Sequence, residues 1–220
     1  MDDNYERGTC TFKFVLWAFR PCIVGFKKCR PVISINTTHL YGKYKGKLMI
    51  AMATNANNKI YPLAFAVVES KSTKTWGWFL VCIRRYVTNR RHLCVISDRH
   101  PAIQAVFRDI SWDFLQPPMI EHCYCLHHLC NNVNTRWNNE TLKNLVWRVA
   151  SATQERKFNA TFELIENVNW DAHQYLKDVP KDKWALAFDK SYCLLENLVL
   201  YLIQNTQWKQ QSRIYFIHER

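Results

Sequence analysis

Two polar residues, Asn36 and Asp98, each stand at the end of a short apolar segment of this 220-residue chain. Residues 32–35 precede Asn36, and residues 92–97 precede Asp98. Such segments are typical of buried β-strands, and a polar residue at a strand tip is a common way to build an active site. A carboxylate there could hold Mg²⁺ for chemistry on phosphates, because this ion prefers anionic oxygen ligands. Asn36 is therefore unexpected, since its amide offers only a neutral oxygen.

Asp98 has a second interpretation that the sequence leaves open. Residues 100–110 are predicted to form a helix with Pro101 near its first turn. An aspartate just before such a helix can accept hydrogen bonds from its first backbone N–H groups. At this stage Asp98 is either a metal ligand or a helix cap.

A second group of chemically active residues lies within ten positions of the chain. Its members are His122, Cys123, Cys125, His127, His128 and Cys130. Zinc prefers such ligands, but a structural zinc site needs four, and only Cys125 and His128 form a well-spaced pair. The sequence therefore argues against zinc. Cys123 and Cys125, two residues apart on a predicted strand, could instead pack side by side in the core.

The chain is strongly basic, with a formal net charge of +12 at pH 7, and 14% of its residues are aromatic. This balance favours a polyanionic partner, and nucleic acid fits it best. The residues that could follow DNA phosphates are Lys43, Lys45, Lys47, Arg84, Arg85, Arg90 and Arg91. Because charge runs are often only solvated faces, an inert basic surface is the alternative.

The N-terminal residues open with acids and lack the apolar core of a signal peptide. No apolar run approaches the roughly 18 residues of a membrane span. We therefore expect an intracellular protein without a membrane partner. Its nine cysteines should then be mostly reduced rather than joined in a disulfide framework.

The order of predicted elements indicates a mixed α/β sheet. Strands are expected at 32–35, 48–54, 60–69, 92–97 and 119–125, and helices at 72–87 and 100–110. Short turns join the first three strands, which should be antiparallel. Helical connections should make the last two strands parallel to the first. An RNase H-like core, with about five strands and flanking helices, has this order.

The pattern changes after residue 125, where every segment has helical spacing. An all-α insertion therefore follows the sheet. The expected regions are an N-terminal lead-in at 1–29, an RNase H-like core at 30–125, a helical insertion at 126–188, and a divergent C-terminal helix and tail at 189–220.

Four segments, at residues 14–70, 76–87, 93–103 and 122–129, have a distinctive sequence. The most specific are HLYGKYKGKL at 39–48 and VISDRHPAI at 95–103. With the region around them, from about residue 14 to about residue 188, they resemble the transposase domain of plant Mutator-like elements (MULE). The resemblance implies an RNase H-like fold and a nuclear protein that acts on DNA.

The resemblance also implies which residues form the site. The family cuts and rejoins DNA with an Asp-Asp-Glu triad that holds two Mg²⁺ or Mn²⁺ ions. Its first Asp falls on Asn36, its second on Asp98, and its Cys-x-x-His signature on Cys125 and His128. Its Glu has no matching context here, and Glu196 is the nearest candidate by position.

Asn36 is the departure with the largest consequence. The family's first Asp bridges both metals, whereas Asn offers one neutral oxygen and an NH₂ group that faces the second cation as a donor. Asn55 likewise stands where the family has an Asp. His39, three residues after Asn36, could still orient a ligand or touch a phosphate.

Three functions remain open. The first is a degenerate MULE transposase domain that is catalytically impaired and retains DNA binding. The second is an active metal-dependent transposase or nuclease that uses Asp98 with substitute acids such as Glu69 or Glu196. The third is a domesticated nuclear regulator or interaction module that pairs with itself or with related transposases. The first is favoured because Asn36 removes a charge that two-metal chemistry requires.

Overall fold

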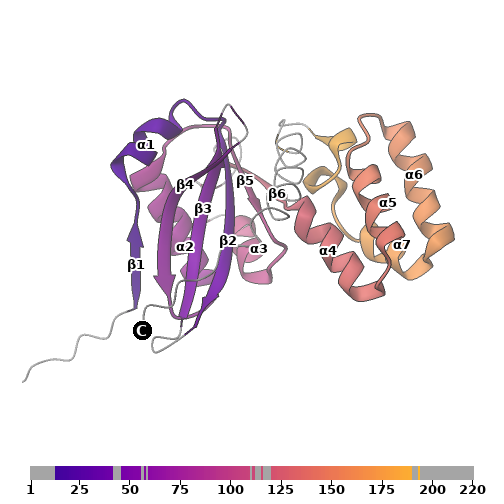
Figure 1. Ribbon diagram of the computed structural model, residues 1–220, viewed down its shortest axis with the longest axis horizontal. Coiled ribbons are helices and arrows are strands. Elements are labelled where there is room, and N and C mark those ends of the chain that lie inside the picture. Colours follow the sequence, from indigo (N-terminus) through magenta and orange to yellow (C-terminus); the bar gives the residue numbers. More distant parts are fainter. Residues whose placement is uncertain are drawn as a thin grey trace, which may run out of the picture.

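Six strands pair into one mixed sheet in the computed structural model, which describes residues 13–41, 46–55, 57, 59–109, 111, 115, 120–189 and 193. The strands are β1 (Phe14–Trp17), β2 (Val32–Leu40), β3 (Gly46–Thr54), β4 (Ile60–Val68), β5 (Leu93–Ser97) and β6 (Ile120–Tyr124). Their order across the sheet is β1-β4-β3-β2-β5-β6 (Figure 1).

The pairing directions confirm the prediction from connection lengths. Strands β2, β3 and β4, which follow one another through short turns, are antiparallel neighbours. Strand β5 runs parallel to β2, and β6 runs parallel to β5, because a helix or a long segment connects each to the preceding strand. The chain is therefore a mixed α/β protein, as the sequence indicated.

Residues 14–26, expected to be part of a lead-in, instead contribute two elements. Strand β1 pairs antiparallel with β4, and helix α1 (Arg20–Phe26) packs beside the same strand. The aromatic side chains of β1 hold it in place, since Phe14 contacts Trp78 and Trp17 stacks on Phe65. Four apolar residues are too short a run for periodicity to identify a strand, so only these contacts reveal it.

Helices cover one face of the sheet. Helix α2 (Thr73–Cys82) continues into a π-helix at Ile83–Val87, and α3 (Pro101–Arg108) lies beside α2 (Figure 1). The apolar stripe of the first of these helices is buried, and its members are Trp76, Phe79, Leu80, Ile83 and Val87. Ser72 caps α2, because its hydroxyl accepts from the Thr75 N–H.

Strand burial follows from this covering. Much of β3 and β4 alternates between fully buried and more exposed residues, whereas all five residues of β5 are buried. Alternation is expected where the two faces of a strand differ in cover, and an uninterrupted apolar strand where both faces are covered. Strand β5 lies between β2 and β6, and its Cys94 and Ile96 side chains pack in a small cluster with Cys123, Cys125 and Cys193.

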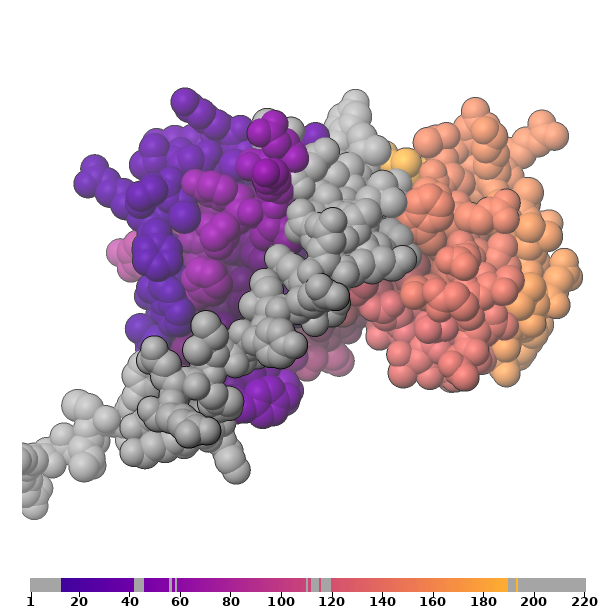
Figure 2. All heavy atoms as spheres, viewed as in Figure 1, coloured from indigo at the N-terminus to yellow at the C-terminus, as the bar shows by residue number. Residues whose placement is uncertain are grey.

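The segment from residue 126 to 188 forms a second lobe beside the sheet, visible in Figures 1 and 2. Its helices are α4 (Leu126–Trp137), α5 (Glu140–Ala150), α6 (Glu155–Val168) and α7 (Trp170–Lys177), followed by 3-10 turns at Lys181–Lys183 and Leu186–Phe188. Asn139 and Asn169 cap α5 and α7 through their side-chain oxygens. No helix among the described residues is long and apolar enough to cross a membrane.

A disulfide joins Cys94 of β5 to Cys193, 99 residues further along the chain. The buried Cys123 thiol of β6 completes a cluster in which the three sulfur atoms lie within 4.8 Å of one another. The sequence predicted mostly reduced thiols, and six of the eight described cysteines are free, with this pair as the exception. Spacing along the chain carried no sign of the pairing, because only the sheet brings β5 and β6 to residue 193.

Breaking this disulfide is expected to lower stability. The bridge closes a loop of about a hundred residues, for which the loss is typically about 2–4 kcal/mol. Urea unfolding followed by circular dichroism should show this loss when dithiothreitol is added. Cys193→Ala should unfold at lower urea and no longer respond to dithiothreitol, whereas Cys22→Ala should keep the response. Equal stability of the wild-type chain with and without reductant would contradict the prediction.

Candidate active site beside strands β2 and β5

Asn36 lies within β2, and Asp98 directly follows β5, the parallel neighbour of β2. The pairing of the two strands ends at Ser34 and Ile96, and each candidate stands two residues further along the chain. Both side chains are half-buried. The predicted end of β2 at residue 35 is wrong, because the strand continues to Leu40 and Asn36 pairs there with Ile50 of β3. Asp98, in contrast, directly follows the last residue of β5, as predicted.

Each of these side chains is partly engaged by its own backbone. The Asn36 Oδ1 accepts a hydrogen bond from the Thr37 N–H at 2.8 Å. The Asp98 Oδ1 accepts one from the His100 N–H at 3.2 Å. His100 caps α3, because its Nδ1 accepts from the Ala102 N–H at 3.2 Å. The interpretation of Asp98 as the cap of this helix is therefore wrong.

Cys125 and His128 lie beside Asp98. The Cys125 N–H donates to the Ser97 carbonyl at 2.6 Å, which places Cys125 next to Asp98 at the start of α4. Burial raises the pKa of the Cys125 thiol to about 11, so it stays protonated at neutral pH. Burial lowers the pKa of His128, and the Asp98 carboxylate opposes this effect. The Cys-x-x-His signature thus faces the acid at the strand tip.

The other members of the Cys/His run point elsewhere. His122 is buried 2.8 Å from the Ser97 hydroxyl and stacks on Phe107, and burial lowers its pKa to about 3. Cys123 joins the sulfur cluster, and Cys130 lies in the core of the helical lobe. The fold therefore does not gather this run into one ligand set. Cys123 and Cys125 do share one small apolar cluster, as their period-two spacing indicated.

Two other candidates lie away from Asp98. His39 is exposed near the end of β2, where the Lys47 Nζ lies 2.6 Å from its Nδ1. Glu69 follows the end of β4, and the paired positions Val68, Lys47 and His39 place it two strands from β2. Glu69 is exposed and does not reach the strand tip at Asn36.

Three further candidates, Lys43, Lys45 and Glu196, lie outside the described residues. Asn55 lies at the opposite end of the sheet, where its Oδ1 accepts from the Lys59 N–H in the β3–β4 turn. Its role is that of a turn residue, so it says nothing about the site.

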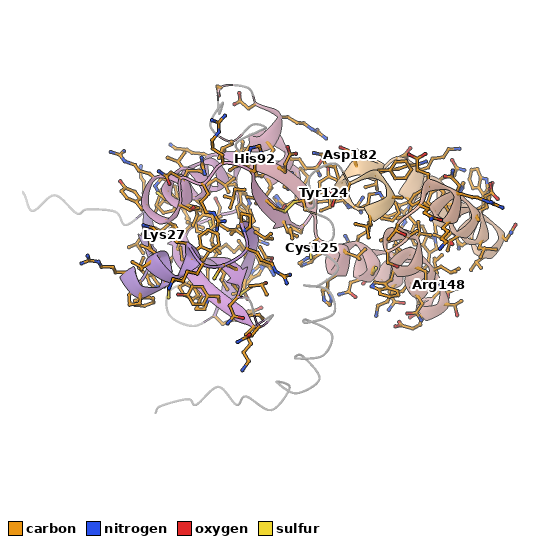
Figure 3. The ribbon with its side chains drawn as sticks, turned by 90° about the horizontal axis from the view of Figure 1, so that it is seen from above. Lys27, His92, Tyr124, Cys125, Arg148 and Asp182 are labelled. Atoms are coloured by element: carbon orange, nitrogen blue, oxygen red, sulfur yellow. A yellow bond between two sulfur atoms is a disulfide. The ribbon has the colours of Figure 1, made fainter. Side chains whose placement is uncertain are left out.

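A cleft of about 400 Å³ opens beside Asp98, between the sheet and the helical lobe. His128 and Tyr124 line it together with Asp98, and Figure 3 shows Tyr124 and Cys125 at this junction. The far wall is the segment Asp178–Pro180 that follows α7. The sequence analysis missed this cleft, because its walls come from parts of the chain about eighty residues apart.

A basic surface forms at the opposite end of the sheet. It comprises the exposed side chains of Lys27, Lys28, Arg85 and Arg91. Residues 20–31 and 83–92, which meet at this end, contain no Asp or Glu. Their contact is direct, because the Arg90 Nη1 donates to the Cys29 carbonyl at 2.9 Å.

The predicted arginine cluster therefore divides into two kinds. Arg84 and Arg90 bind backbone carbonyls: the Arg84 Nη1 donates to the Arg90 carbonyl at 2.7 Å. Burial lowers the pKa of Arg84, although an arginine remains charged at neutral pH. Arg85 and Arg91 are exposed and stay available to a partner. Sequence alone could not separate the two kinds, since all four lie in one run.

Comparison with known proteins points to one family. Residues 32–132 match the MULE transposase domain. A curated relative, Protein FAR1-RELATED SEQUENCE 4 from Arabidopsis thaliana, is 21% identical over 173 residues. The alignment covers 76% of this chain but only 22% of that protein, so this chain corresponds to about a fifth of the relative's length. The matched region contains β2 to β6 and the start of α4, and thus both strand tips.

Proposed function

We propose that this chain, in which residues 32–132 are a MULE transposase domain, is a transposase-derived DNA-binding protein that has lost two-metal catalysis. The observation that carries the proposal is an amide rather than a carboxylate at Asn36, two residues beyond the Ser34–Ile96 pair, where Asp98 follows the neighbouring strand. The nucleus is the compartment where such a protein would meet its DNA.

The residues at the strand tips do not fit a pair of Mg²⁺ or Mn²⁺ ions. Such a pair needs several carboxylates, because each ion carries two positive charges. Among the described residues, Asp98 is the carboxylate that directly follows β5. One of its oxygens already accepts a hydrogen bond from the His100 N–H. Asn36 has no charge to share, and its oxygen accepts the Thr37 N–H. Losing one well-placed electrostatic group commonly slows a reaction on the order of 10²–10³-fold.

DNA binding does not require the lost charge. The basic surface offers four exposed cations on two segments free of acidic residues. Phosphate contacts of this kind supply most of the affinity of sequence-independent DNA binding. DNA binding by this surface would therefore be electrostatic, and the affinity should depend strongly on the salt concentration.

Removing part of the basic surface should flatten that salt dependence. The variant Lys27→Ala/Lys28→Ala/Arg91→Ala should bind a labelled 30-base-pair duplex more weakly in fluorescence anisotropy. Each lost phosphate contact should reduce the slope of log K against log salt by about 0.9. The control Arg148→Ala/Arg156→Ala/Lys157→Ala removes the same charge from the helical lobe and should keep most of the wild-type slope. Equal losses in both variants would place DNA elsewhere.

The loss of catalysis is tested separately with supercoiled plasmid and Mg²⁺ or Mn²⁺. The wild-type chain should nick plasmid no faster than Asp98→Ala, since the wild-type site lacks the second carboxylate. Robust nicking that disappears in Asp98→Ala would overturn this part of the proposal. It would leave the DNA-binding part intact.

A further inference from the structure

Arg99, the residue after Asp98, is a half-buried cation without a carboxylate partner among the described residues. Its guanidinium lies over the Tyr175 ring, 4.8 Å from the ring centroid, and its Nη2 donates to the Tyr175 hydroxyl. Its Nε is buried and has no acceptor in the part of the chain that the structure describes. Arg99 also lines the cleft beside Asp98.

Such a placement is costly unless an anion balances it. Burial lowers the pKa of Arg99, but the guanidinium remains charged at neutral pH. Buried charges in proteins are usually paired, because removing a charge from water without compensation is strongly unfavourable. The ring of Tyr175 supplies only part of that compensation. The arrangement is therefore typical of a site that binds a negatively charged ligand.

A hydrogen-bond network holds this part of the cleft in shape. The Gln104 Nε2 donates to the Arg99 carbonyl at 2.8 Å, which fixes the backbone at Arg99. The Gln104 Oε1 accepts from the Arg108 Nη2 at 3.0 Å and from the Tyr124 hydroxyl at 3.4 Å. All four residues line the cleft. Gln104 thus links Arg99, Arg108 and Tyr124 by hydrogen bonds on the same wall of the cleft.

We propose that this wall binds one phosphate group of a DNA backbone through Arg99 and Arg108. Arginine suits this ligand because its planar guanidinium can donate two hydrogen bonds to phosphate oxygens. Asp98 and Asp178 also line the cleft, so the phosphate lies on the side of the two arginines. A cleft of about 400 Å³ has room for a phosphate and the adjoining sugar.

This site is separate from the basic surface and deepens the proposed function, on which it rests. The basic surface lies at the end of the sheet where β5 begins, and the cleft lies where β5 ends. A phosphate held by Arg99 would lie next to Asp98, the remaining acid of the ancestral site. The chain would then keep the position of its DNA after losing the reaction.

The test measures duplex binding by fluorescence anisotropy for the wild type, Arg99→Ala, Arg99→Lys and Arg148→Ala. Arg99→Ala should weaken binding about tenfold or more, as expected for lost hydrogen bonds to a charged group. Arg99→Lys should lose part of the affinity, because a lysine lacks the planar fork. Arg148 is an exposed arginine on the helical lobe, away from the junction in Figure 3, and its variant should bind within about twofold of the wild type.

A second arm uses inorganic phosphate, so that free phosphate and the DNA backbone are distinguished. Phosphate should raise the melting temperature of the wild type above that in chloride at equal ionic strength, and should not raise it in Arg99→Ala. A shift with phosphate and no change of DNA affinity in Arg99→Ala would overturn DNA as the source of the phosphate.

The remaining outcomes also decide between the proposals. Wild-type DNA binding that neither Arg99 variant changes would overturn the phosphate site and leave the proposed function standing. Failure of the wild type to bind DNA would overturn the proposed function, and with it DNA as the ligand of the cleft. If Arg99→Ala does not fold by circular dichroism, the Arg99→Lys variant and the wild-type phosphate shift carry the same decision.

Discussion

Asn36→Asp should create a divalent-cation site beside the end of β5. The new carboxylate and Asp98 each stand two residues beyond the Ser34–Ile96 pair, and the added charge would attract the ion that one acid holds weakly. At an effective dielectric constant near 20, two unit charges about 4 Å apart interact by about 4 kcal/mol. We therefore expect Mn²⁺ affinity, measured by calorimetry, to rise by at least about tenfold.

The same substitution should make stability depend on metal. Two carboxylates facing each other across adjacent strands repel, and such pairs lower stability by up to about 1 kcal/mol. In EDTA, Asn36→Asp should therefore melt below the wild type, and Mn²⁺ should restore it by binding the folded state. The wild type should respond much less to Mn²⁺.

Two controls separate the geometry from the charge. Thr38→Asp adds an equal charge to β2 at an exposed position two residues further on, and should leave Mn²⁺ affinity nearly unchanged. Adding Asp98→Ala to Asn36→Asp should abolish the gain. If Asn36→Asp binds Mn²⁺ no better than Thr38→Asp, the two strand tips do not form a metal-binding corner.

The plasmid assay on Asn36→Asp then tests whether the new carboxylate is enough for DNA cleavage. Cleavage by this variant would show that the third acid is present and positioned. Metal binding without cleavage would locate the remaining defect outside the two strand tips, at the acid for which Glu196 is the candidate.

Trp184→Ala should produce the largest loss of stability among the substitutions considered. The Trp184 side chain is 1% exposed, packs against Phe158 of α6, and donates its Nε1–H to the Val179 carbonyl at 3.3 Å. Truncating a buried tryptophan typically costs about 3–5 kcal/mol. Because Val179 lines the cleft, the loss should also loosen the Asp178–Pro180 wall and weaken any ligand bound there.

Trp170→Ala is a matched control, since this tryptophan begins α7 but is 60% exposed. It should change the free energy of unfolding by about 0.5 kcal/mol or less. Urea unfolding followed by circular dichroism compares the two without depending on tryptophan fluorescence. A loss below about 1 kcal/mol for Trp184→Ala would mean that segment 178–188 does not pack on α6 as described.

Much of the sheet was predictable from local pattern. The strands at β2 to β6 appear as apolar runs, and their directions follow from whether a turn or a helix connects them. The end of β5 just before Asp98 was predicted, whereas the continuation of β2 past Asn36 to Leu40 was not, because residues 36–39 are all polar and show no apolar alternation. Strand β1 was missed, since its four residues acquire meaning only against Phe65 and Trp78.

The sequence by itself determined the mixed α/β class, the helical segment after residue 125, the basic charge and the amide, rather than a carboxylate, at position 36. These depend on residue type and on spacing within one element, which the chain carries locally. Tertiary structure alone decided that Cys94 meets Cys193, that Arg84 is occupied while Arg85 is exposed, and that Arg99 has no carboxylate partner among the described residues. Each of these depends on contacts between distant segments, and a residue's charge or thiol has no partner until the fold supplies one.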